Sequence, residues 1–156
     1  SKADKLLREL TGYRLRRANM AAEAKFNRLF ADYGLRRTTF SVLSLVVDNP
    51  GLRQSDLAAV LSIERPNLVQ IIDELEAEGL MVREVAANDR RAYALQPTVA
   101  GRRLFNKVMA GARTCDADLT QGLSPDQINV LQIALDLIET RTETREDHDE
   151  LKISRA

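Results

Sequence analysis

Two short segments with apolar residues at helical spacing, joined by only two residues, constrain the fold of this 156-residue chain most strongly. Ser55 is placed to cap the first segment, residues 56–61, and Ser62-Ile63 forms the connection. The second segment has Pro66 in its first turn, where a missing N–H does no harm, and it continues to Gly79. Two helices joined by so short a turn are typical of a helix-turn-helix.

Longer helical patterns flank this pair. The spacing predicts one helix over residues 4–31 and another over 38–48, which could start at Thr38. Thr98 can cap a helix over 99–119, and Ser124 followed by Pro125 predicts the start of a last helix. After Thr140 the sequence is polar, so we expect it to fray or to lie on the surface.

The apolar period changes between the second short helix and Thr98. Residues 80–85 and 93–95 suit two strands, and the polar segment 86–91 suits a turn between them, so we expect a β-hairpin. Aromatic residues are scarce, with no Trp, four Phe and three Tyr, which favours helices packed through aliphatic side chains. The predicted fold class is mainly α with a small β-hairpin wing (α+β).

The predicted second short helix carries polar side chains suited to reading DNA bases in a major groove. The hairpin tip adds Asp89-Arg90-Arg91, and a narrow minor groove attracts inserted arginine side chains. The formal net charge is zero, but the arginines and acids are clustered, so the total can hide a basic face. The candidate DNA-binding residues are Arg53, Ser55, Glu64, Arg65, Asn67, Gln70, Asp89, Arg90 and Arg91.

Several runs of residues resemble the winged helix of the MarR (multiple antibiotic resistance regulator) family. They are Gln54-Ser55-Asp56-Leu57-Ala58, Leu75-Glu76-Ala77-Glu78-Gly79-Leu80, Asp89-Arg90-Arg91-Ala92 and Leu95-Gln96-Pro97-Thr98-Val99-Ala100-Gly101. Relatives usually begin the recognition helix with a small hydroxyl residue, whereas this chain has Arg65-Pro66-Asn67, and Gln70 and Glu74 replace basic residues. The operator sequence therefore cannot be borrowed from a relative.

The resemblance implies a cytoplasmic homodimer that binds a pseudo-palindromic duplex DNA operator, mostly as a repressor, and releases it when a small molecule binds. It implies dimerisation helices within residues 1–32 and 99–145 and a DNA-binding lobe over 33–98. Residues 146–156 are then a polar C-terminal tail. Nothing in the sequence resembles a signal peptide or a membrane span.

Helix one and the start of the next helix carry clustered arginines that could bind an anionic effector, such as an aromatic acid or an acyl-coenzyme A. Charge runs on helices usually face solvent, and apolar residues at this spacing usually belong to a core. A ligand site and an ordinary solvated face with a packed core therefore both remain open. The candidate ligand-binding residues are Tyr13, Arg16, Arg17, Asn19, Met20, Arg36 and Phe40.

Other classes of function have less support in the sequence. A single His and a single Cys exclude a zinc cluster within the chain and do not assemble a catalytic triad, so we expect no enzyme, metal or cofactor. Cys115 could sense oxidants, although its neighbour Asp116 disfavours a reactive thiolate. A winged helix that binds protein rather than DNA is the remaining alternative.

The arginines of the hairpin tip give a direct test. If Arg91 contacts the DNA, Arg91→Ala should weaken binding to most duplex sequences and reduce the salt slope by about one per lost contact in each wing. Arg65→Ala and Asn67→Ala should instead change which operator is preferred. Binding titrations at several salt concentrations measure both effects, and an unchanged affinity and slope for Arg91→Ala would show that the wing does not touch DNA.

Overall fold

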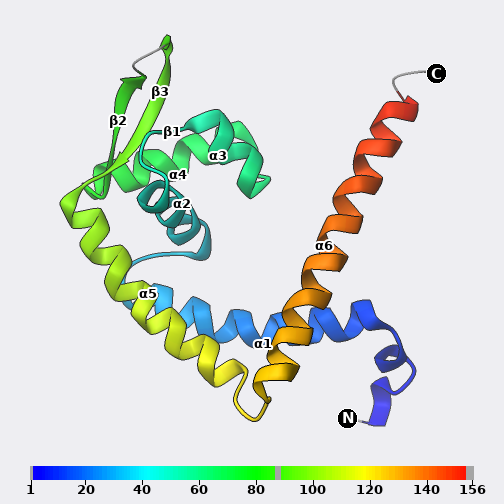
Figure 1. Ribbon diagram of the computed structural model, residues 1–156. Coiled ribbons are helices and arrows are strands. Elements are labelled where there is room, and N and C mark those ends of the chain that lie inside the picture. Colours follow the sequence, from blue (N-terminus) through cyan, green and yellow to red (C-terminus); the bar gives the residue numbers. More distant parts are fainter. Residues whose placement is uncertain (1, 87–88, 154–156) are drawn as a thin grey trace. The chain divides into compact units, whose positions relative to one another are not determined.

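The computed structural model describes residues 2–86 and 89–153, with the backbone alone at residues 2, 86, 89–92 and 141–153. It confirms a mainly helical fold with a small antiparallel sheet (Figure 1). In chain order the elements are the 3-10 turns η1 (Lys2–Asp4) and η2 (Leu7–Glu9), α1 (Thr11–Asp32), α2 (Arg37–Asp48), β1 (Leu52–Arg53), α3 (Gln54–Leu61), α4 (Arg65–Ala77), β2 (Met81–Ala86), β3 (Asp89–Pro97), α5 (Val99–Leu119) and α6 (Pro125–Ile153). The chain divides into two compact units, Ser1–Asp116 and Ala117–Ala156.

The core of the first unit lies where α2, α3, α4 and the sheet meet. The strands run in the order β1-β3-β2, and Leu95 at the centre of the sheet is paired with Leu52 on one side and Arg83 on the other. The short strand β1 was not expected from the sequence. The fully buried side chains of this core are Val42, Leu43, Val46, Leu57, Leu68, Ile72, Leu75, Met81, Leu95 and Val108.

Several helix ends form as the sequence predicts. The Thr98 hydroxyl accepts the Gly101 N–H at 3.0 Å, and Ser124 accepts the Gln127 N–H at 3.2 Å while Gln127 Oε1 accepts the Ser124 N–H at 2.8 Å. Gly79 follows α4 with a φ of +67°, a conformation that glycine adopts without strain. These local hydrogen bonds explain why the boundaries could be read from sequence.

The prediction of one helix over residues 4–31 was wrong, because α1 begins only at Thr11. Leu10 is extended, and two 3-10 turns precede it. Asp4 holds this arrangement by accepting hydrogen bonds from Arg8 Nε at 3.0 Å and from the Tyr13 hydroxyl at 2.9 Å. These two bonds, from Arg8 first, lower the pKa of Asp4 from 3.8 to about 2, so its carboxylate stays charged at more acidic pH than an ordinary aspartate.

Three other local expectations also differ from the structure. Ser55 does not cap α3, which begins at Gln54, because its hydroxyl donates to Asp56 Oδ1 at 3.2 Å. Thr39 rather than Thr38 closes the first turn of α2, accepting the Arg36 N–H at 2.8 Å. The polar chain after Thr140 was expected to fray or to lie on the surface; its backbone is helical, since α6 continues to Ile153.

The second unit is dominated by α6, whose apolar side chains are largely exposed within the single chain. No helix in the described part of the chain combines the length and the apolar character needed to cross a bilayer. The exposed large apolar residues of α6 are Val130, Leu131, Ile133, Leu135, Leu137 and Ile138. A stripe of this kind requires another apolar surface to cover it in water.

Gly101 gives a test of how the start of α5 packs against the segment between α4 and β2. A Cβ at this position would lie 1.9 Å from the Leu80 carbonyl oxygen, a backbone atom that cannot move aside easily. Gly101→Ala should therefore reduce the free energy of unfolding by about 3 kcal/mol or more. Gly12→Ala is the control, because a Cβ there meets nothing within 4 Å, and it should stabilise α1 by up to about 1 kcal/mol. Equal unfolding midpoints for the two variants would contradict this packing.

Candidate DNA interface and effector pocket

Helix α4 has a buried apolar back and an exposed polar front. Leu68, Ile71, Ile72 and Leu75 are buried, which leaves the predicted base-reading residues exposed. The turn before α4 is tight because Ser62 is left-handed, with a φ of +49°, and the Ile63 N–H donates to the Ala58 carbonyl at 3.1 Å. The exposed predicted residues are Glu64, Arg65, Asn67 and Gln70 on this segment, and Arg53 and Ser55 before it.

The acidic side chains in the second half of α4 are held by arginines from other elements. Arg83 of β2 pairs with Asp73 Oδ1 at 2.6 Å and with Glu76 Oε2, and its backbone N–H donates to Glu76 Oε1 at 2.8 Å. The Arg36 guanidinium pairs with Glu74. These pairs fix the wing and the start of α2 against α4 and offset its negative charge. The sequence analysis missed Arg83, which a pattern of charges alone does not single out.

The β2–β3 hairpin forms the predicted wing. The strands pair in register from Met81 opposite Pro97 to Val85 opposite Tyr93, and the register shifts after Val85. β3 is longer than predicted and begins at Asp89, so the Asp89-Arg90-Arg91 run belongs to a strand. The side chains of these three residues lie outside the described part of the structure, so their contact with DNA stays a prediction.

None of the predicted ligand-binding residues lines the α2–α5 cavity described below. Arg36 is occupied by Glu74, and the Tyr13 hydroxyl donates to Asp4. Phe40 stacks between Phe30, with ring centroids 4.7 Å apart, and Phe105, with centroids 6.0 Å apart. The remaining predicted residues are exposed on α1; they are Arg16, Arg17, Asn19 and Met20.

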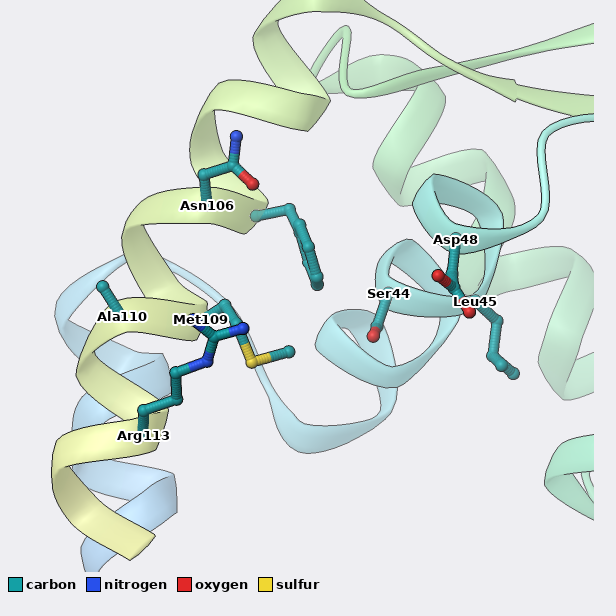
Figure 2. Close-up of a pocket in the computed structure, with 8 residues that line it drawn as sticks. Ser44, Leu45, Asp48, Asn106, Met109, Ala110 and Arg113 are labelled. Atoms are coloured by element: carbon teal, nitrogen blue, oxygen red, sulfur yellow. The ribbon is translucent and has the colours of Figure 1, made fainter. Parts of the chain in front are cut away.

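A cavity of about 610 Å³ lies instead between α2 and α5. Figure 2 shows Ser44 and Asp48 of α2 opposite Met109 and Arg113 of α5, and Leu45 also lines the cavity. The lining combines an aromatic ring and aliphatic groups with one cation and one carboxylate, a combination that suits an amphipathic small molecule. The complete lining is Ser44, Leu45, Asp48, Phe105, Asn106, Met109, Ala110 and Arg113.

The residues that line the cavity, Arg113 among them, were not predicted. Phe105 links the cavity to the predicted residues, since its ring stacks on the predicted Phe40. A spacing of four along α5, as between Phe105, Met109 and Arg113, does place the three side chains on one face and could have suggested them.

A helix-turn-helix followed by a two-stranded wing defines a winged-helix protein. The MarR family profile matches residues 33–92. A Thauera aromatica protein assigned to transcriptional regulation of the hcr operon is 32% identical over 114 residues, which cover 72% of this chain and 69% of that protein. The chain belongs to the MarR family, and it is a DNA-binding transcription regulator rather than an enzyme.

Two solved structures are also similar along most of the chain. The transcriptional repressor CouR bound to a 23-mer DNA duplex is 36% identical, with a TM-score of 0.81 over 87% of this chain and 96% of that one. CouR from Rhodococcus jostii RHA1 bound to p-coumaroyl-CoA is 29% identical, with a TM-score of 0.74 over 81% of this chain and 90% of that one. The resemblance seen in the sequence is thus confirmed at the level of the fold.

The Arg83 pairs predict a specific pattern of mutational effects. Arg83→Gln should reduce the free energy of unfolding by about 1–2 kcal/mol, because it leaves two carboxylates without their cation at a partly exposed site. Adding Asp73→Asn and Glu76→Gln should recover part of the loss, and chemical denaturation of the variants measures it. If the losses in free energy of unfolding from the three single changes simply added up in the triple variant, the three side chains would not be coupled.

Proposed function

We propose that the chain is a homodimeric repressor, released from a pseudo-palindromic operator by a small anionic effector. The observation that carries the proposal is α4, whose apolar back is buried while its polar N-terminal half is presented next to a β-hairpin wing. An α-helix of this kind fits a major groove, and the wing then reaches the adjacent minor groove. CouR bound to a DNA duplex supports this use of the fold.

The proposed dimer follows from apolar surface that a single chain leaves uncovered. Exposed large side chains on α6, such as Leu131 and Leu135, need a partner surface, and a second copy supplies an identical one. In a two-fold dimer the two α4 helices can enter major grooves about 34 Å apart on one face of the duplex. The protein then works in the compartment that holds DNA, and we place it in the cytoplasm.

The proposed effector site is the cavity between α2 and α5. The guanidinium group of Arg113 can pair with a carboxylate or phosphate, while Phe105, Leu45 and Met109 supply apolar and aromatic contact. Asp48 and Ser44 can bind hydroxyl groups at the α2 side of the cavity. An aromatic acid or its coenzyme A thioester has both characters, and the complex of CouR with p-coumaroyl-CoA supports this class.

Helix α2 couples the proposed effector site to the DNA-binding helix α4. Ser44, Leu45 and Asp48 line the cavity, while Val42, Leu43 and Val46 of the same helix lie in the core with α4. A ligand that separates α2 from α5 therefore tilts α2 and α4 together and changes the position of α4. In a dimer, a modest tilt in each protomer spoils the spacing of the two recognition helices. By linkage, the effector must then bind the DNA-free conformation more tightly.

The alternatives from the sequence have less support in the structure. A winged helix that binds only protein would not require the exposed Arg65, Asn67 and Gln70 on α4. Cys115 is half-buried on α5 and does not line the described cavity, so the cavity offers no support for redox sensing.

The proposal predicts that Arg113→Ala uncouples the effector from the operator. In anisotropy titrations with an operator duplex from the protein's own upstream DNA, p-coumaroyl-CoA and related aromatic acyl-CoA probes should release the wild type. Arg113→Ala should bind the operator normally but need about fivefold more probe, for the loss of about 1 kcal/mol. The control is Arg103→Ala, an exposed arginine of α5 outside the cavity. Equal probe responses in the two variants would contradict the assigned site.

A further inference from the structure

The wing carries an exposed apolar pair that the proposed DNA contacts do not use. Val85 of β2 and Tyr93 of β3 are directly opposite each other in the antiparallel register. More than half of each side chain is exposed, 59% for Val85 and 53% for Tyr93. An aromatic residue and a β-branched residue at paired positions form one continuous surface.

The alternation of side chains along the strands places this pair on the face of the hairpin that looks toward α4. Met81, Arg83 and Val85 share one face of β2, and their partners on β3 lie on that same face. Met81 and Leu95 on this face are fully buried in the core, and Arg83 pairs with the acids of α4. Val85 and Tyr93 therefore continue the α4-facing surface outward along the hairpin that projects from the lobe (Figure 1).

The geometry of duplex DNA determines which part of the duplex contacts the α4-facing side of the hairpin. A major groove and its adjacent minor groove are separated by one sugar-phosphate strand. With α4 in the major groove and the wing tip in the minor groove, as in the proposed function on which this inference rests, that strand passes between α4 and the wing. The α4-facing side of the hairpin is then in contact with sugars and phosphates rather than with bases.

We propose that Tyr93 and Val85 form a backbone-binding surface for this strand. The Tyr93 hydroxyl donates a hydrogen bond to a phosphate oxygen, and the ring and Val85 pack against the deoxyribose groups. Tyrosine is among the side chains that hydrogen-bond to phosphate in protein–DNA complexes.

The salt dependence of binding can distinguish a DNA contact made by Tyr93 from one made by an arginine. Arg83, next along the same face, is already engaged by Asp73 and Glu76. The hydrogen bond from Tyr93 adds no positive charge, so it releases no counterion from the DNA. Loss of the tyrosine hydroxyl should thus lower affinity without changing the salt slope, whereas loss of a wing arginine should change both.

The test is a set of anisotropy titrations with the full chain, using the operator duplex and an unrelated duplex at several salt concentrations. Tyr93→Phe should weaken binding to both duplexes by about fivefold for each wing, with an unchanged salt slope. Tyr93→Ala should weaken it further, because the ring contact is lost as well. Tyr33→Phe is the matched control, since Tyr33 is an exposed tyrosine between α1 and α2, outside the wing, and it should bind like the wild type.

Two results would overturn the inference while the wild type still binds duplex DNA with a normal salt slope, so that the proposed function stands. The first is Tyr93→Phe and Tyr93→Ala binding as tightly as Tyr33→Phe. The second is unchanged DNA binding together with an altered sedimentation of Tyr93→Ala, which would assign the pair to contacts between protein copies. A wild type that fails to bind any duplex would overturn the proposed function itself, and the inference with it.

Discussion

The packing of α4 on α2 is the contact on which the rest of the structure depends. Val42, Leu43 and Val46 of α2 lie in one core with the buried side chains of α4, and burying each such side chain contributes about 1.5–3 kcal/mol. This contact decides which side of α4 is exposed and therefore which residues can reach DNA. The opposite side of α2 lines the cavity against α5, so the proposed effector site and α4 both contact the same helix.

Much of this architecture could be predicted because the deciding interactions are local in sequence. Thr98 and Ser124 accept hydrogen bonds from N–H groups three residues ahead, and Gly79 provides the left-handed turn after α4. The apolar back of α4 repeats at helical spacing, which separates it from the polar front. The fold class and the exposure of the predicted base-reading residues follow from such local features.

The features that could not be predicted depend on contacts between particular side chains, most of them far apart in the chain. Near the start of the chain, Asp4 binds Arg8 and Tyr13 while α1 begins only at Thr11, and an apolar spacing carries no sign of that arrangement. Asp48 and Arg113 line one cavity from different helices, while the more conspicuous arginines near Arg16 remain on the surface. Arg36 was expected to bind a ligand, yet it pairs with Glu74, 38 positions along the chain. Clustered charge in a sequence shows where cations are available, but only the packing of helices shows which of them face a cavity.

The central claim is that one conformational equilibrium, carried by α2 and α4, links the effector cavity to the operator. Calorimetric titration of p-coumaroyl-CoA into the free protein and into the protein saturated with operator measures this link directly. The account predicts weaker binding to the operator complex, by roughly 5- to 150-fold for a coupling of typically 1–3 kcal/mol. Equal affinity in the two states would contradict it.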